Sequence, residues 1–403
     1  MTYQETLDWM FAQLPMYQHK GPKAFNGKLD NIRELSQYLG DPHKQFKSIH
    51  IAGTNGKGSS SHMLASVLQE AGYKTGLYTS PHLKDFRERI RIDGKPVEQA
   101  FVIDFIQKHR DFFEARKMSF FEMTVGMAFQ YFAENQVDIG VIEVGLGGRL
   151  DATNIIEPEI SLITNIGMDH TDTLGNSLEQ ITREKAGIIK AGIPVVISEK
   201  QPEIAGLFEE IAANRNAPIV FAEDIVNASY ETPLLGNYQL KNIRGVVATL
   251  NGLNGLEISE NAIKQGMLNV VKNTGLMGRW QLLQTAPKVV ADTAHNSEGL
   301  AIVLEQIQQQ PYEKLRLVLG FVEDKNLEQI LPLLPKDAIY YISRPDIRRG
   351  LSAAVLREKM QDYGLKVREF SSISTAFDTA LSEAGEKDFI FVGGSTFTVA
   401  EVL

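Results

Sequence analysis

The sequence predicts an α/β protein with a larger N-terminal domain and a smaller C-terminal α/β domain. Its 403 residues are more than one hydrophobic core usually organises. Apolar runs rich in β-branched residues alternate with amphipathic stretches of helical length, a pattern typical of parallel sheets covered by helices. A glycine-rich break at 273–279 separates two such series. We therefore predict a first domain at 1–277, a linker at 278–287 and a second domain at 288–403.

The first series supplies the elements of the larger domain. Each expected strand is a short apolar run bounded by polar or turn-forming residues, and each expected helix is longer and amphipathic. The expected strands are 48–52, 76–79, 138–144, 160–164, 194–198 and 218–221. The expected helices are 60–70, 237–250 and 259–271.

The second series predicts a small Rossmann-like sheet. Its expected strands are 288–291, 315–319, 338–342 and 389–392, with helices at 298–309 and 353–363. A dinucleotide-dependent dehydrogenase is disfavoured, because neither Gly320 nor the pair Gly393-Gly394 belongs to a G-x-G-x-x-G turn after the first strand.

Composition excludes several classes of function. The chain has no cysteine, which removes disulfides, thiolate nucleophiles and cysteine-based metal centres. A net charge of −9 disfavours binding to nucleic acid by bulk attraction. The first residues do not resemble a signal peptide, and no apolar run is long enough to cross a bilayer. We expect a cytoplasmic protein with no membrane partner.

A glycine loop after the first strand indicates phosphate binding. The strand 48–52 leads into Gly53-Thr54-Asn55-Gly56-Lys57-Gly58-Ser59, and a helical run follows. Glycines allow backbone amides to face a phosphate, and a helix N-terminus adds partial positive charge. Lys57 would reach the outer phosphates, and Ser59 would offer its hydroxyl to Mg²⁺. The spacing differs from G-x-x-x-x-G-K-[ST], because Gly58 separates the lysine from the serine.

Two further strand ends carry candidate metal ligands. Glu143 ends a buried-strand pattern, and the carboxyl end of such a strand lies beside the phosphate loop in a parallel sheet. The glycines of 145–148 would permit close backbone approach to a ligand. His170 follows the next strand. The alternatives are a strand end in solvent for Glu143 and a structural role for His170.

These segments together resemble the folylpolyglutamate synthase and dihydrofolate synthase family, within the Mur-type ligases. The resemblance runs in family order over nearly the whole chain. It is carried by 52–59, 79–83, 88–90, 143–154, 169–170, 184–190, 236–242, 278–279 and 294–296.

The resemblance implies an N-terminal P-loop ATPase domain of Mur-ligase type and a glutamate-binding C-terminal domain. It implies ATP-dependent addition of L-glutamate to a folate γ-carboxylate through an acyl phosphate, by an enzyme that commonly acts as a monomer. ATP would be bound by 53–59, Asn242, Arg279 and Asp292. Two Mg²⁺ ions would use Ser59, Glu143, His170 and a carbamylated Lys185. Catalysis would depend on Lys57, Lys185 and His295, and substrates would contact Pro81, His82, Arg89, Phe121, Asp151, His295 and Ser395.

Anionic substrates of an acidic protein require local cations. Arg87, Arg89 and Arg91 are expected to face the folate, with Phe121 stacking on the pterin unless it is helix core. Three arginines, Arg344, Arg348 and Arg349, are expected to face glutamate or a polyglutamate tail, unless they form a solvated surface. Asp292-Thr293-Ala294 replaces the Asp-Gly-Ala of many relatives, and Thr396-Phe397 replaces Leu-Tyr, which puts amino-acid specificity in question.

Three alternatives compete with this interpretation. An enzyme that also joins glutamate to dihydropteroate would be bifunctional, and the sequence leaves this open. A cell-wall Mur ligase would carry a further domain before the phosphate loop, where this sequence has 52 residues. A P-loop regulatory module would not need the motif 292–296 after the linker.

Overall fold

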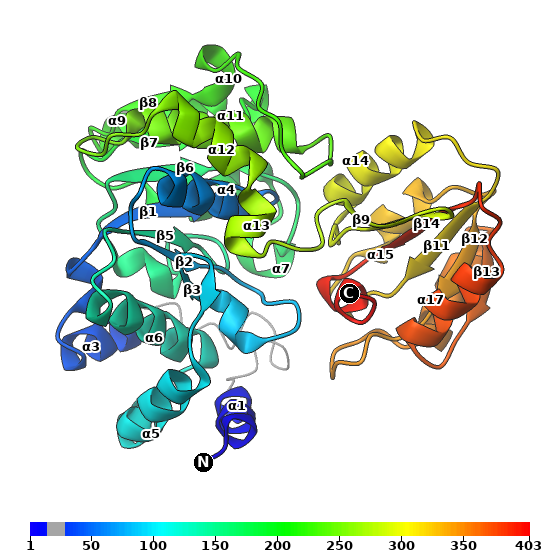
Figure 1. The fold of residues 1–403 in the computed structure, drawn as a ribbon, viewed down its shortest axis with the longest axis horizontal. Helices are drawn as coiled ribbons and strands as arrows, with labels where there is room; N and C mark the ends of the chain where they lie inside the picture. Colours follow the sequence, from blue (N-terminus) through cyan, green and yellow to red (C-terminus); the bar gives the residue numbers. More distant parts are fainter. Residues whose placement is uncertain (14–28) are drawn as a thin grey trace. The chain divides into compact units, whose positions relative to one another are not determined.

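The computed structural model describes residues 1–13 and 29–403. Its described part divides into two compact units. Unit 1 comprises Met1–Pro233 and Leu240–Gly275, and unit 2 comprises Leu234–Gln239 and Leu276–Leu403. Both are drawn in Figure 1.

Unit 1 is built on an eight-stranded sheet with the order β4-β3-β2-β5-β1-β6-β7-β8. The pairs from β2 through β8 are parallel, whereas β3 runs antiparallel to β2 and β4. The strands are β1 (Lys47–Ala52), β2 (Thr75–Tyr78), β3 (Ile90–Ile92), β4 (Lys95–Pro96), β5 (Ile139–Glu143), β6 (Ile160–Ile163), β7 (Val195–Ile197) and β8 (Ile219–Phe221).

Helices flank this sheet. Figure 1 shows α3, α5 and α6 grouped at one end of the unit, and α9, α10 and α11 near β7 and β8 at the other. The helices are α1 (Tyr3–Ala12), α3 (Asp30–Tyr38), α4 (Lys57–Glu70), α5 (Gln99–Arg116), α6 (Phe120–Glu134), α7 (Thr171–Leu174), α8 (Leu178–Lys185), α9 (Pro202–Asn214), α10 (Ala222–Ile225), α11 (Gln239–Gly252), α12 (Glu260–Leu268) and α13 (Val270–Thr274).

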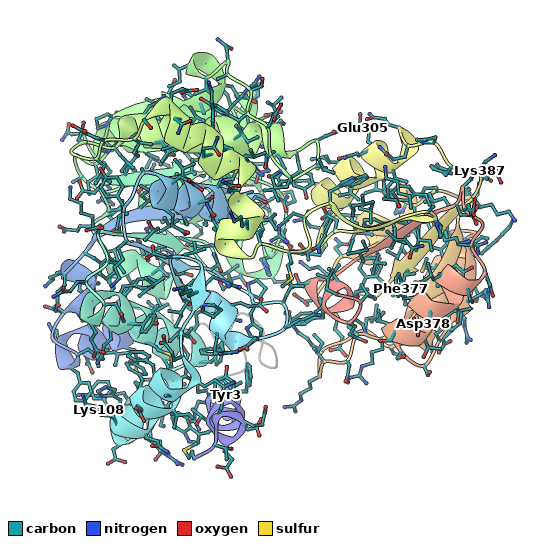
Figure 2. All side chains as sticks on the ribbon, in the orientation of Figure 1. Tyr3, Lys108, Glu305, Phe377, Asp378 and Lys387 are labelled. Carbon is teal, nitrogen blue, oxygen red and sulfur yellow. The ribbon has the colours of Figure 1, made fainter. Side chains whose placement is uncertain are left out.

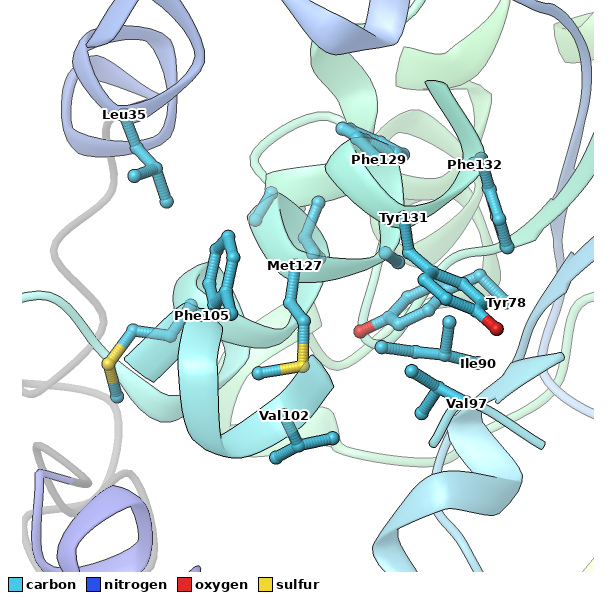
Figure 3. Close-up of a cluster of buried hydrophobic side chains, with 14 of the residues drawn as sticks. Leu35, Tyr78, Ile90, Val97, Val102, Phe105, Met127, Phe129, Tyr131 and Phe132 are labelled. Carbon is cyan, nitrogen blue, oxygen red and sulfur yellow. The ribbon is translucent and has the colours of Figure 1, made fainter. Parts of the chain in front are cut away.

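A large apolar core lies between α3, α5, α6 and the strands β2 and β3 (Figure 3). Leu35 from α3, Phe105 from α5 and Met127 from α6 contribute to it, together with Tyr78 and Ile90 from the sheet. A capping box at Ser119 begins α6, because its hydroxyl accepts from the Glu122 amide while the Glu122 carboxylate accepts from the Ser119 amide. A second core contains Ala52, Val144 and Ile163 and packs at the strand ends that carry the site.

Unit 2 has a six-stranded sheet with the order β13-β12-β11-β14-β10-β9. Only the β9–β10 pair is antiparallel. The elements are β9 (Gln281–Thr285), β10 (Lys288–Ala291), α14 (Ser297–Gln308), β11 (Leu315–Leu319), α15 (Leu327–Ile330), β12 (Ile339–Ile342), α16 (Ala353–Asp362), β13 (Lys366–Glu369), α17 (Ile373–Ser382), β14 (Phe389–Gly393) and α18 (Thr396–Ala400). The side chains of both units are drawn in Figure 2, where Tyr3 marks α1 and Lys387 marks the turn before β14.

The predicted α/β class and the positions of the ten expected strands are confirmed, within a residue or two at the ends. The expected helix 259–271 is two helices, because the chain leaves helical geometry at Asn269 (φ −96°, ψ 8°). The expected linker 278–287 is corrected: it contains β9, whose pairing with β10 makes it part of the second sheet. Short strands such as β3 and β13 were not anticipated, since pairing rather than local pattern defines them.

Segment 234–239 also differs from the predicted domain boundary, because it groups with unit 2. Its backbone is held by one side chain of α14: the Asn237 amide donates to Gln306 Oε1 at 2.7 Å, and Gln306 Nε2 donates to the Leu235 carbonyl at 2.8 Å. We call residues 234–239 the strap.

Candidate active site

The phosphate loop lies between β1 and α4, as the sequence predicts. The Thr54 amide donates to the Asn165 carbonyl at 2.9 Å, and the Asn55 amide donates to Asn165 Oδ1 at 2.8 Å. The Thr54 hydroxyl accepts from the Gly167 amide at 2.9 Å. One face of the loop is therefore fixed to the segment after β6. The first turn of α4, which contains Lys57 and Ser59, remains the part of the loop suited to a phosphate, because the first amides of a helix have no acceptor within it.

Two glycines of the loop are required by close contacts. Gly53 has φ +145°, and a Cβ there would lie 1.8 Å from Thr164 Oγ1. Gly56 has φ +86°, and a Cβ there would lie 2.2 Å from Asn242 Oδ1. The second contact places Asn242, the predicted adenine contact on α11, directly against the phosphate loop.

Two lysines meet at one carbonyl of this loop. Lys57 Nζ donates to the carbonyls of Gly53 at 2.9 Å and Thr54 at 3.1 Å, and Lys185 Nζ donates to the same Gly53 oxygen at 2.9 Å. Lys185 is buried at the end of α8. Burial, reinforced by the charge of Lys57, lowers the pKa of Lys185 to about 7.

The predicted metal ligands stand on elements that border this loop. Glu143 ends β5 opposite Ile51 of β1, is buried, and its Oε2 accepts from the Ser80 amide at 3.2 Å. The alternative of a strand end in solvent is therefore wrong. Ser59 is buried in the first turn of α4. His170 is the N-cap of α7 with φ +51°, and its Nε2 lies 4.0 Å from Asp169 Oδ2.

No group of three or more histidine, aspartate or glutamate side chains that could hold a metal occurs among residues 1–13 and 29–403. The predicted set contains two such side chains, Glu143 and His170, and adds a hydroxyl and a lysine. These residues fit Mg²⁺ if Lys185 is converted to an oxygen ligand. Two observations favour that conversion: Lys185 has a lowered pKa, and its Nζ contacts Gly53 after β1, the strand that pairs with the Glu143 strand.

Residues predicted to bind the folate gather after β2. Arg89 is buried, donates from Nε to His82 Nδ1 at 2.7 Å, and stacks over Phe120 at 5.1 Å from the ring centroid. Burial and the Arg89 charge lower the pKa of His82 to about 3, which keeps the ring neutral. Phe121 lies beside Tyr78, with ring centroids 6.2 Å apart. Pro81 adjoins His82 in the loop after β2.

The expected arginine cluster is divided among different partners. Arg87 pairs with Asp85 at 2.6 Å, and Arg91 donates to the Gly94 carbonyl at 3.2 Å. Of the three, Arg89 is the one that contacts His82.

Asp151 has a different environment from the one expected of a substrate contact. It is buried, and its carboxylate accepts from the amides of Gly145, Leu146 and Thr153 and from the Thr153 hydroxyl. These four donors account for its acceptor positions, so its role in this structure is to hold the loop after β5. The glycines of that loop likewise approach protein rather than ligand: a Cβ on Gly145 would lie 2.4 Å from the Phe121 ring, and one on Gly148 2.7 Å from the Lys185 carbonyl.

In unit 2, Asp292 is buried at the end of β10. It accepts from the Tyr238 hydroxyl at 2.6 Å, the Trp280 amide at 2.7 Å and the Ala294 amide at 2.8 Å. Arg279 hydrogen-bonds the Gly278 carbonyl and the Thr293 hydroxyl. The buried Asp292 carboxylate thus organises the strap and the turn after β10.

The two residues predicted for the amino acid follow β10 and β14. His295 Nδ1 lies 3.0 Å from the Thr293 carbonyl, and Ser395 caps α18 by accepting from the Thr398 amide at 3.0 Å. In the loop after β12, Arg349 pairs with Asp324 at 3.3 Å and lies over Phe397 at 5.3 Å, while Arg344 donates to the carbonyls of Ile347 and Arg348.

Three residues of the site were missed by sequence reasoning: Asn165, Asn154 and Tyr238. Each makes a hydrogen bond to a segment far away in the sequence, and for Asn154 that partner is the Gly187 carbonyl. Asn165 had one usable signal, because it follows the strand that neighbours the phosphate-loop strand.

Comparison with known protein families first defines the class of enzyme to which the chain belongs. Residues 51–224 match the Mur ligase middle domain, and residues 278–396 match the Mur ligase glutamate ligase domain. The protein is therefore a Mur-type ligase. Among the described residues, no helix has the length and apolar character required to span a membrane.

The relatives then define the family. The chain is 32% identical to the dihydrofolate synthase/folylpolyglutamate synthase of Bacillus subtilis, over 99% of this chain and 98% of that one. It spans half the length of a Haloferax volcanii relative, named probable bifunctional folylpolyglutamate synthase/dihydropteroate synthase, at 31% identity over 100% of this chain. The chain belongs to the folylpolyglutamate synthase/dihydrofolate synthase family.

Solved structures of folylpolyglutamate synthase/dihydrofolate synthase enzymes share the fold of this chain. Escherichia coli FolC in complex with DHPP and ADP superposes with a TM-score of 0.85 at 29% identity, covering 98% of this chain and 96% of that one. A bifunctional folylpolyglutamate synthase/dihydrofolate synthase with Mn, AMPPNP and L-glutamate bound gives 0.84 at 29% identity, covering 100% and 97%.

Proposed function

We propose that this protein adds L-glutamate to the γ-carboxylate of folates, with conversion of ATP to ADP and phosphate. The observation that carries the proposal is the phosphate loop, where Lys57 and Lys185 converge on the Gly53 carbonyl beside the buried Glu143. Family membership gives the substrate class. Relatives have been solved with ADP, DHPP and L-glutamate, the kinds of molecule that such a reaction needs.

The reaction begins when a folate carboxylate oxygen attacks the γ-phosphorus of ATP, and the bond to the bridging oxygen of ADP breaks. Lys57 offsets the charge of the transferred group from the first turn of α4. The amine of glutamate then attacks the acyl phosphate, loses a proton, and phosphate leaves as the amide forms. His82 and Arg89, a neutral ring bonded to a buried cation, orient the folate side.

Mg²⁺ would neutralise the outer phosphates, and Ser59, Glu143 and His170 would hold it. Lys185 would take part as a carbamate. Its neutral amine attacks carbon dioxide, one C=O bond becomes C–O⁻, and the nitrogen releases a proton. The lowered pKa of Lys185 favours this step, because the unprotonated amine is the nucleophile.

Unit 2 would supply the glutamate site through His295 and Ser395. We further propose that Arg348 and Arg349 attract the glutamate or the polyglutamate tail. Arg348→Ala and Arg349→Ala should raise the KM for glutamate and leave the KM for ATP unchanged. An unchanged KM for glutamate in both variants contradicts this assignment.

The second candidate is a bifunctional enzyme that also joins glutamate to dihydropteroate. The name of the B. subtilis relative favours it, because that name pairs dihydrofolate synthase with folylpolyglutamate synthase. The deciding assay measures ADP release with ATP, Mg²⁺ and L-glutamate, supplying tetrahydrofolate or dihydropteroate in parallel, and identifies products by mass. One glutamyl increment on tetrahydrofolate supports the proposed function, and increments on both acceptors support the bifunctional enzyme. No increment on either acceptor contradicts the folate assignment.

A further inference from the structure

The end of α8, which carries Lys185, is pressed against the loop that follows β5. Gly148 and Gly187 make this approach possible. A Cβ on Gly148 would lie 2.7 Å from the Lys185 carbonyl, and one on Gly187 would lie 2.4 Å from Arg149 Cα. Both obstructing atoms are backbone atoms, which cannot rotate away. The two segments therefore interlock through positions where no side chain larger than hydrogen fits.

Hydrogen bonds join the same two segments. The Arg149 amide donates to the Glu184 carbonyl at 2.7 Å, and the Arg149 guanidinium pairs with the Glu184 carboxylate at 2.8 Å. That ion pair is half exposed and contributes little. The buried contacts come from Asn154, whose Nδ2 donates to the Arg149 carbonyl and to the Gly187 carbonyl, each at 3.1 Å. One amide group thus bridges the loop and the turn after α8.

Asn154 is also fixed on its other side. The main-chain carbonyl of Asn154 accepts from Lys190 Nζ at 2.8 Å. Asn154 is therefore bonded to the segment after α8 at two points, through its side chain and through its backbone. The preceding residue, Thr153, hydrogen-bonds Asp151 and contacts His50 of β1 at 2.9 Å. The bridge is consequently anchored to the strand that leads into the phosphate loop.

We propose that Asn154 is a positioning residue for Lys185: its bridging amide sets the end of α8 so that the Lys185 side chain reaches the Gly53 carbonyl. The inference rests on the proposed function, in which carbamylated Lys185 is a ligand of Mg²⁺. Without the bridge the turn after α8 separates from the loop, and the Lys185 nitrogen no longer has one fixed position beside the phosphate loop.

The test compares Asn154→Asp with the wild-type protein and with Asn227→Asp. The aspartate keeps the shape of asparagine but places oxygen where Nδ2 donates, opposite two carbonyl oxygens. Asn227 is an exposed residue of the same unit, so its variant carries the same chemical change outside the site. Each protein is equilibrated with ¹³C-labelled bicarbonate and Mg²⁺, and the carbamate carbon is measured by NMR. Lys185→Met assigns that signal by removing it.

We expect Asn154→Asp to lose most of the carbamate signal and about tenfold in kcat, with the KM for ATP nearly unchanged, as for other residues that orient a metal ligand. High bicarbonate should restore part of the activity. A wild-type carbamate signal and kcat in Asn154→Asp overturn the inference. If the aspartate variant unfolds, Asn154→Ala removes the donors without adding charge, and the same outcomes apply to it.

The two proposals fail in different ways. Wild-type protein that shows neither carbamate nor glutamate addition contradicts the proposed function and the inference together. Wild-type protein that is carbamylated and active, with Asn154 variants that match it, contradicts the inference alone.

Discussion

The Gly53 carbonyl oxygen accepts from two lysine side chains, and this atom connects the phosphate loop to the end of α8. Such convergence places two cations in a buried space, which favours the neutral form of one of them. Lys185 is the more buried of the two, and burial together with the charge of Lys57 lowers its pKa to about 7. In the proposed function, Lys57 acts on the phosphate as a cation, and the unprotonated amine of Lys185 is the nucleophile toward carbon dioxide.

Lys57→Ala should abolish turnover, because the loop then lacks the ammonium that balances the transferred phosphoryl group. We expect a loss of about 100-fold or more in kcat. ADP release with saturating tetrahydrofolate and glutamate measures it. Lys264→Ala, at an exposed position on α12, is the matched control. Turnover at the wild-type rate in Lys57→Ala would contradict the phosphate-loop assignment.

The burial of His50 predicts that the free energy of unfolding depends on pH. Burial, with a smaller effect from Lys190, lowers its pKa from 6.5 to about 3. In the unfolded chain His50 protonates near its ordinary pKa, so its contribution to the free energy of unfolding is present above pH 6.5 and is lost as the pH falls toward 3. Urea unfolding midpoints from pH 8 to pH 4 should therefore fall less steeply in His50→Gln than in the wild-type protein. Parallel profiles would show that His50 is not responsible.

At the scale of elements, the site depends on how closely backbone segments approach one another. The loop after β5 contains three glycines that sequence reasoning assigns to a ligand, yet Gly148 faces the backbone of α8 and Gly145 faces Phe121. A glycine-rich motif indicates that something packs closely against the backbone, but it does not show whether that is a ligand or another part of the chain. In this protein the approach is that of another part of the chain.

Gly187→Ala should destabilise unit 1, because its Cβ would lie 2.4 Å from Arg149 Cα. A cost of about 1–3 kcal/mol in the free energy of unfolding is typical of such crowding. Gly206→Ala is the matched control: it lies within α9 with no heavy atom within 4 Å of its Cβ position, and should stabilise by about 0.5–1 kcal/mol. Denaturant unfolding of both variants measures the difference. Equal changes in the free energy of unfolding for Gly187→Ala and Gly206→Ala would contradict the close packing of Gly187 against Arg149.

At the scale of the whole molecule, the chain passes between its two units three times, near residues 234, 240 and 276. The strap therefore returns to unit 1 through α11, the helix whose Asn242 lies against Gly56. Within unit 2 the strap is held by the Tyr238–Asp292 hydrogen bond and by Gln306. The Tyr238–Asp292 hydrogen bond and the short stretch of backbone from Tyr238 to Asn242 thus connect the buried Asp292 to the residue that lies against the phosphate loop.

Tyr238→Phe should release the strap from Asp292. The change leaves a buried carboxylate with one donor fewer, at a cost of about 1–3 kcal/mol. Hydrogen exchange of the intact protein should rise at residues 234–239 and at the turn 292–296, and stay unchanged in β12. Tyr230→Phe, whose hydroxyl makes a long 3.4 Å contact with Glu260 in unit 1, serves as the control. Unaltered exchange in the strap would show that Tyr238 does not hold it.

The α/β class, the ten expected strands, the phosphate loop and the family could all be predicted from the sequence, because they depend on hydrophobic periodicity and on contiguous motifs. Tertiary structure alone decided that 278–287 belongs to the second sheet, that the strap groups with unit 2, and that Asp151 and Asp292 are occupied by backbone and tyrosine donors. It also decided which atoms Asn154 bridges. The physical reason is common to all four: a hydrogen bond or strand pairing between distant segments leaves no local periodicity, so only the folded chain shows which donor meets which acceptor.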